Sequence, residues 1–176
     1  MGLILSAAPL RSSYITVERH SENGCVTALP VCLQGDGGSV RAWGQADVTV
    51  IDSIFMESRA SRGGAISVVG ASLTASNTFF LNCTASDGGG AISIIDYQCY
   101  GASSTNTEVR LEGCSFASCH APGGSGGAIK MMGSSTNIQT VSLRIISSSF
   151  TRYGYAYIID LKGPNDGDSP IHSESH

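Results

Sequence analysis

Lysine is nearly missing from this chain of 176 residues, in which only Lys130 and Lys162 occur. Charged residues of all kinds make up 14%, against about 25% in ordinary globular domains. The formal net charge is −4. Because nucleic acids and anionic membranes are bound through basic surfaces, this composition argues against both as main partners.

Long apolar runs are missing as well. No stretch reaches the roughly 18 consecutive apolar residues of a membrane-spanning helix, so we expect no transmembrane segment. The first residues, MGLILSAAPLR, contain a short apolar run without the preceding basic residues of a signal peptide. We expect residues 1–24 to form a lead-in or capping strand, and a clipped signal peptide is the alternative.

Motifs for metals and cofactors are missing too. There are six cysteines, but no pair of Cys-x-x-Cys motifs, and the four histidines are scattered along the chain. Zinc sites need closely spaced ligands of these types. The stretch GGSGGAIK lacks the Gly-Lys-Ser/Thr ending of a phosphate-binding loop. We therefore expect no metal ion and no cofactor.

What the chain does contain is an internal repeat. Three segments superimpose: SIFMESRASRGGAISV from Ser53, TFFLNCTASDGGGAISI from Thr78 and CSFASCHAPGGSGGAIKM from Cys114. Each has a Phe, a small residue three positions later, an Ala five positions later, and then Gly-Gly-Ala-Ile. The residues expected to be structural are Phe55, Phe80, Phe116 and Phe150 with the pairs Gly63 and Gly64, Gly89 and Gly90, and Gly126 and Gly127.

Short strands flank these motifs. Apolar and polar residues alternate before each Phe, and a second short apolar stretch follows each glycine pair. The apolar positions are Val48 and Val50, Leu73 and Ala75, Val109 and Leu111, Leu143 and Ile145 before the Phe, and Ile66 and Val68, Ile92 and Ile94, Ile129 and Met131 after the glycines. Each repeat therefore reads as two strands and a corner.

The repeat length indicates the architecture. Successive Phe residues are 25, 36 and 34 positions apart, and the longer spacings contain corner insertions. Repeats of this length with stacked short strands predict an all-β fold, a right-handed parallel β-helix (β-solenoid) of about four to five rungs. We place it at residues 25–162, followed by a polar, flexible tail at 163–176. An antiparallel sandwich is the alternative, although it does not require the same residue types in every repeat.

The Gly-Gly-Ala-Ile blocks and the Phe79-x-x-Asn82 motif resemble the repeats of chlamydial polymorphic outer membrane proteins. Similar repeats occur in secreted or surface right-handed parallel β-helix proteins with the pectin-lyase-like fold. The resemblance covers about residues 25–160 of this chain. It implies a surface or passenger-type module that is secreted or located at the cell surface, with no shared catalytic residues.

The expected function is therefore a non-catalytic binding or adhesion-type module with a protein or glycan partner. Recognition usually lies on loops of a rigid scaffold, which points to the insertions at 95–107 and 132–140. Two arginines are expected to share a column on adjacent rungs, which is either a ligand-contact patch or an ordinary solvated strand face. The candidate contact residues are Arg110, Arg144, Glu108, Glu112, Tyr97 and Tyr100.

Two other functions remain open. The pectin-lyase-like resemblance also suggests a polysaccharide lyase or glycoside hydrolase, but such enzymes need clustered carboxylates. The acidic residues instead align with corner positions, as Asp52 does with Asn77 and Gly113. The second alternative is a structural subunit that docks through the ends of the solenoid.

Cys83 and Cys119 align at the third position after Phe, so they are expected to be neighbours on adjacent rungs. The spacing of neighbouring strands allows a disulfide, and a ladder of buried thiols is the alternative, which we favour. The sequence Asn82-Cys83-Thr84 is a glycosylation sequon, so Asn82 is a candidate modification site.

Overall fold

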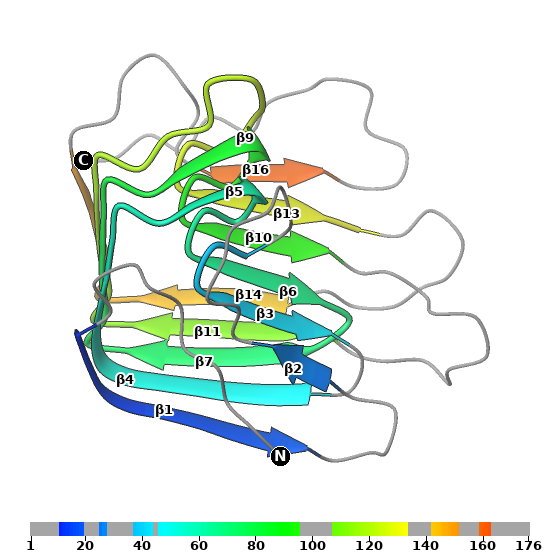
Figure 1. The fold of residues 1–176 in the computed structure, drawn as a ribbon, viewed down its shortest axis with the longest axis vertical. Helices are drawn as coiled ribbons and strands as arrows, with labels where there is room; N and C mark the ends of the chain where they lie inside the picture. Colours follow the sequence, from blue (N-terminus) through cyan, green and yellow to red (C-terminus); the bar gives the residue numbers. More distant parts are fainter. Residues whose placement is uncertain are drawn as a thin grey trace.

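The computed structural model describes residues 11–19, 25–27, 37–43, 46–95, 107–133, 142–151 and 159–162. Strands are the only regular elements in these ranges, and most of them pair in parallel (Figure 1). The prediction of an all-β fold is therefore confirmed.

The strands form three sheets. Sheet A contains β1 (Arg11–Arg19), β4 (Ala46–Met56), β7 (Ser72–Ser76), β8 (Phe79–Leu81), β11 (Glu108–Glu112), β12 (Ser115–Ala117), β14 (Ser142–Ile146) and β15 (Ser149–Thr151). Sheet B contains β2 (Cys25–Thr27), β3 (Val40–Trp43), β6 (Ile66–Val69), β10 (Ile92–Ile95), β13 (Ile129–Met132) and β16 (Ile159–Lys162). Sheet C pairs β5 (Arg59–Arg62) with β9 (Thr84–Gly88).

The parallel pairs have the register that the repeat predicts. Leu73 of β7 lies between Val48 of β4 and Val109 of β11, and Leu143 of β14 follows. In sheet B, Ile92 lies between Ile66 and Ile129 in the same way. Equivalent residues of successive repeats are therefore direct neighbours across the strands.

Each repeat contains more strands than the expected two. In the repeat around Phe80, β7, β8, β9 and β10 follow one another, and Phe80 lies inside β8 rather than at a corner. The extra divisions come from residues with positive φ, which turn an extended chain sharply. Asn77 (φ 48°) separates β7 from β8, and Asn82 (φ 53°) separates β8 from β9.

These turning residues recur in register. The first corner has Asp52, Asn77, Gly113 and Ser147, and the second has Glu57, Asn82 and Ser118, all with φ between 48° and 61°. Gly, Asn and Asp tolerate this conformation better than other residues do, because they lack a Cβ or have short polar side chains. Asp52 is thus a turn residue with positive φ, as its alignment with Asn77 and Gly113 predicts.

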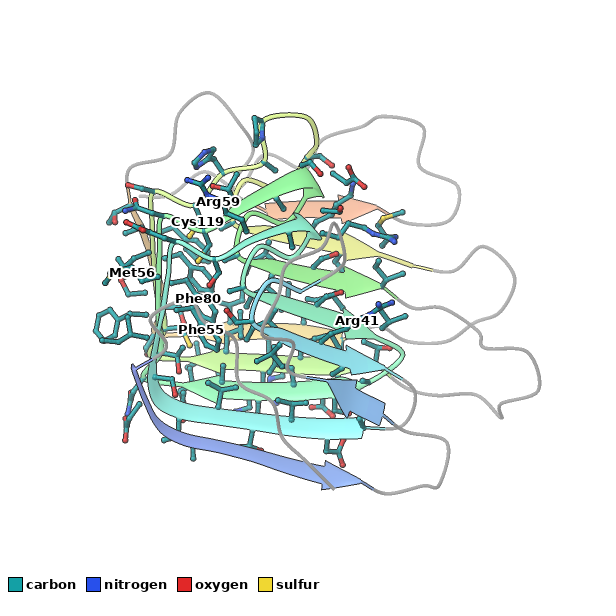
Figure 2. All side chains as sticks on the ribbon, in the orientation of Figure 1. Arg41, Phe55, Met56, Arg59, Phe80 and Cys119 are labelled. Atoms are coloured by element: carbon teal, nitrogen blue, oxygen red, sulfur yellow. The ribbon has the colours of Figure 1, made fainter. Side chains whose placement is uncertain are left out.

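The core is built from stacked columns of apolar side chains. The rings of Phe55 and Phe80 are stacked with their centroids 5.1 Å apart and their planes nearly parallel, and the stack continues through Phe116 to Phe150. Phe55, Phe80 and Phe116 are completely buried. Figure 2 shows Phe55 and Phe80 in the interior between the sheets, with Met56 pointing out at one side.

The glycine pairs are needed because other backbone atoms lie too close for a side chain, as the carbonyl of Gly90 in the next repeat does at Gly64. Gly63 has φ +60°, and an added Cβ would collide with the carbonyl of Ile66. Its own N–H donates to the carbonyl oxygen of Gly88 in the next repeat, at 3.2 Å. The glycines are therefore architectural in these repeats.

The N-terminal edges of the two large sheets are paired differently from the rest. β1 runs antiparallel along β4 from Ala46 to Ile54, and β2 runs antiparallel to β3 (Figure 1). β1 lies within the segment expected to contain a lead-in strand. The proposed tail at 163–176 lies outside the described residues.

Candidate functional site

The outer face of sheet A carries a polar column that runs across the strands. Thr49, Thr74, Arg110 and Arg144 are direct neighbours in register from β4 to β14. The structure therefore confirms that the two arginines are aligned on neighbouring strands. Glu108 lies beside Ser142, and Glu112 lies beside Ile146, so the two acids flank the arginine column on either side.

Arg110 and Glu112 form an ion pair on this face. The guanidinium Nη2 of Arg110 donates to Oε2 of Glu112 at 2.9 Å, and the two side chains are 41% and 50% exposed. An ion pair so open to water contributes little to stability. Its main effect is to hold the Arg110 guanidinium, while Arg144 is exposed and has no ion pair to any described residue.

The remaining predicted contact residues cannot be placed beside this column. Tyr97 and Tyr100, and nearly all of the insertions at 95–107 and 132–140, lie outside the described residues. The described part of the candidate site therefore consists of two arginines, two glutamates and the hydroxyl groups of the two threonines.

A second polar column, on sheet C, was not predicted. Arg59 pairs with Thr84, and Thr84 forms a bridge to His120. The Oγ1 of Thr84 and Nε2 of His120 are 3.4 Å apart, and His120 Nδ1 lies 3.2 Å from the carbonyl oxygen of Ser118. All three residues stand four positions after an aligned Phe, so the repeat alignment contained this signal.

Lys130 reaches the same region from sheet B. Its aliphatic chain passes over Gly88, where any Cβ would collide with it, and its Nζ donates to the carbonyl oxygen of Asp87 at 2.9 Å. The ammonium group therefore has a backbone partner near the sheet C column.

The small residues after the turning positions donate hydrogen bonds to the corners. Ser53 Oγ, Thr78 Oγ1 and Ser148 Oγ each donate to the carbonyl oxygen two residues earlier, at 2.8, 2.9 and 3.0 Å. The Cys114 thiol occupies the same column and lies within reach of two carbonyl oxygens, that of Glu112 at 3.6 Å and that of Ala75 in the preceding repeat at 3.5 Å. The hydroxyl groups of Ser53, Thr78 and Ser148 thus each satisfy a backbone carbonyl of their own corner.

Cys83 and Cys119 play the same part at the second corner. Both residues are buried, and each thiol has two carbonyl acceptors within reach. Cys83 can donate to Leu81 at 3.6 Å or to Phe55 at 3.8 Å, and Cys119 can donate to Ala117 at 3.6 Å or to Phe80 at 3.4 Å. Cys83, Cys114 and Cys119 are free thiols in this structure, and Cys83 and Cys119 are the two that belong to the expected column. A hydrogen bond with the Cys119 thiol, together with burial, raises the pKa of Cys83, and burial raises the pKa of Cys114.

Asn82, the sequon residue, is exposed at a corner with its side chain on the surface. Its N–H donates to the carbonyl oxygen of Ala117, so the backbone around it is held in place. Among the described residues, no group of three or more His, Cys, Asp or Glu side chains gathers in a way that could hold a metal ion.

No helix in the described ranges has the length and hydropathy of a membrane span. Family models, curated proteins and solved structures were each compared with the chain, and none of them matches it.

Proposed function

We propose that the chain is a short right-handed parallel β-helix that acts as a non-catalytic binding module, secreted or at a cell surface. The in-register parallel strands and the repeated corners support this architecture, because each turn of such a solenoid lies directly on the previous one. The resemblance of its repeats to those of surface β-helix proteins supports the location.

The ligand that suits the outer face of sheet A is an anionic glycan, carrying carboxylate or sulfate groups. The observation that carries this proposal is the direct register of Arg110 with Arg144 on the outer face of sheet A, where both side chains reach solvent. A guanidinium presents several N–H donors in one plane and binds such anions through paired hydrogen bonds. The neighbouring hydroxyls of Thr74 and Ser142 can bond to sugar hydroxyls.

Glu112 decides which of the two arginines is available to an anionic ligand. Glu112 already holds Arg110, so an anion arriving there must compete with a carboxylate, whereas Arg144 has no ion pair with any residue that the structure describes. We expect Arg144 to make the main contact and Arg110 a weaker one. A lyase or hydrolase function has no specific observation in its favour, since Asp52 serves a backbone turn.

A glycan array containing neutral, carboxylated and sulfated saccharides tests the proposal. The wild-type chain should bind anionic saccharides, and Arg144→Ala should weaken binding about tenfold, the loss of roughly one charge-assisted hydrogen bond. Arg59→Ala, an exposed arginine on sheet C, is the matched control and should have no effect. Absence of anionic ligands, or equal losses in both variants, would refute the proposal.

A further inference from the structure

The second corner of the repeat accepts several residue types, and one of its levels carries the glycosylation sequon. The corner residues share φ values of 53° to 54° and are Glu57, Asn82 and Ser118. The residues two positions later are Arg59, Thr84 and His120. The corner therefore requires neither the amide of Asn82 nor the hydroxyl of Thr84. Both nevertheless occur together in Asn82-Cys83-Thr84, which is the only Asn-x-Ser/Thr sequence in the chain.

The folded chain presents the first residue of the sequon to solvent. Asn82 is exposed, and its N–H donates to the carbonyl oxygen of Ala117 at 3.0 Å. Cys83 is completely buried, and the N–H of Thr84 donates to the carbonyl oxygen of Ser58 at 2.9 Å. A group attached to the Asn82 side chain can therefore project into solvent without displacing the core.

An apolar surface, here called the outer patch, lies directly before this corner. It consists of the outward-facing residues of the paired strands β4 and β8, which are Ile54, Met56, Phe79 and Leu81. Phe79 is 47% exposed. In the next repeat, Ser115 and Ala117 take the positions of Phe79 and Leu81, so the apolar character does not continue there. Contiguous exposed apolar surface of this kind marks a place where another group binds.

The sequon and the outer patch are close enough to share one occupant. Asn82 follows Phe79 by three positions. At a rise of about 3.3 Å per strand residue, the Cα atoms of these two residues are at most about 10 Å apart. The first sugar rings of a chain attached to Asn82 can span this distance. A sugar ring has faces of C–H groups, and such a face packs against an exposed aromatic ring.

We propose that Asn82 carries an N-linked oligosaccharide whose first sugars pack on Phe79 and cover the outer patch. Two independent features lead to this site: a sequon at an exposed corner that does not require it, and an apolar patch limited to the strands beside it. The modification rests on one part of the proposed function, the passage of the chain through a secretory pathway. It does not depend on the binding of anionic glycans by sheet A.

The transfer is a substitution at a sugar carbon. The donor is an oligosaccharide joined through its anomeric carbon to a lipid diphosphate, and a membrane-bound oligosaccharide transferase catalyses the step. The side-chain nitrogen Nδ2 of Asn82 forms the new bond to the anomeric carbon. The bond from that carbon to the diphosphate oxygen breaks, and the lipid diphosphate leaves with the electron pair. The amide gives up one proton to a base of the transferase, and nothing is oxidised or reduced.

Translation of the full chain behind a cleavable signal peptide, in the presence of microsomes, tests the modification. We expect one oligosaccharide, seen as a mass increase that peptide N-glycosidase reverses and that peptide mapping assigns to Asn82. Asn82→Asp keeps a short polar side chain at the turn, and Thr84→Val keeps the shape of the side chain, yet both should abolish transfer. Asn77→Asp, at another exposed corner outside the sequon, is the matched control and should leave transfer unchanged.

Thermal unfolding with and without the oligosaccharide tests its packing on Phe79. The glycosylated chain should unfold about 2–4 °C above the enzymatically deglycosylated chain, and Phe79→Ser should remove this difference. Ile51→Ser is the matched control and should preserve the difference. Ile51 is 37% exposed, but it lies beside Ser76, before the first corner and away from Asn82.

Three results would each overturn the inference. They are the absence of transfer to Asn82, a stability difference that survives Phe79→Ser, and dimerisation of the glycosylated chain through the outer patch. Because the added signal peptide supplies entry into the microsomes, absent transfer would count against Asn82 as an acceptor. The glycan array tests the proposed binding function separately.

Discussion

The rings of Phe80 and Phe116 stack 4.7 Å apart with only 5° between their planes, although 36 positions separate them in the chain. This distance equals the spacing of neighbouring strands. Both residues lie at the centre of their strands, β8 and β12, which pair in register. The ring stack and the backbone ladder therefore have the same period and stabilise each other.

Removing one ring from this stack should be costly. Phe80→Ala leaves a cavity between Phe55 and Phe116, and we expect a loss of about 4 kcal/mol in the free energy of unfolding. Phe79→Ala, one residue away in the same strand, removes a half-exposed ring and should cost less than about 1 kcal/mol. Urea denaturation measures both, and similar losses would contradict the proposed core.

The two glycine positions should differ in their tolerance of a side chain. Gly63→Ala meets the Ile66 carbonyl, which belongs to the backbone and cannot move aside, so we expect a loss of at least about 3 kcal/mol. Gly113 has a similar φ of +61°, but its nearest neighbour is the side chain of the exposed Asn77, 2.8 Å from the added Cβ, which can rotate away. Gly113→Ala should therefore cost only about 1–2 kcal/mol.

Thermal and urea denaturation of the two alanine variants check this prediction. Equal stability losses at the two positions would mean that the backbone conformation alone, and not the collision with the Ile66 carbonyl, decides the effect.

Two buried serines should respond in opposite ways to the loss of their hydroxyl groups. Ser93 is fully buried, and its Oγ has no hydrogen-bond partner among the described residues. Ser93→Ala should therefore leave stability unchanged or raise it by about 1 kcal/mol. Ser53 is equally buried but donates to the Ile51 carbonyl at 2.8 Å, so Ser53→Ala should lower stability by about 1 kcal/mol. Unfolding curves of the two variants give the comparison, and a clear loss for Ser93→Ala would indicate a partner for its hydroxyl.

The buried thiols should make the protein less stable in alkali. The pKa of Cys83 and the pKa of Cys114 are both raised in the folded chain, whereas the unfolded thiols ionise near pH 8.5. Their contribution is fully present below that pH and is lost as the pH rises above it, because only the unfolded state then releases protons. The expected slope is up to about 1.4 kcal/mol per pH unit for each thiol.

Denaturant unfolding between pH 7 and pH 10 measures this slope. Cys83→Ser is the matched variant, since Ser58 occupies the same column and donors of this size fit there. The variant should show a smaller loss of stability above pH 8.5 than the wild type. Identical pH profiles would show that the thiol ionises freely in the folded protein.

Which side chains form the interior could largely be predicted from the repeat. In parallel strands that stack in register, each level offers its residues the same surroundings, so equivalent positions need equivalent side chains. The columns of Val48, Leu73 and Val109 and the corner of Asp52, Asn77 and Gly113 were predictable for this reason. The alignment of Arg110 with Arg144 in the candidate site followed from the same rule.

The division of each repeat into strands was not predicted. The repeat predicts two strands and a corner, but Asn77 and Asn82 turn the chain on either side of Phe80 and make a separate strand there. Asn is also common in exposed strand ends and loops, so its identity alone does not reveal a positive φ. The sheet C column of Arg59, Thr84 and His120 was missed because the strands that carry it were not recognised.

The sequence by itself determined which residues of successive repeats lie next to one another, because stacking imposes one environment on each repeated position. The tertiary structure decided that β1 and β2 pair in antiparallel orientation with β4 and β3, at the edges of the two large sheets. The alternating residues of RSSYITVER suit a parallel or an antiparallel neighbour equally well. That choice depends on how a segment outside the repeat packs on the first repeat strand, and this contact leaves no periodic pattern in the sequence.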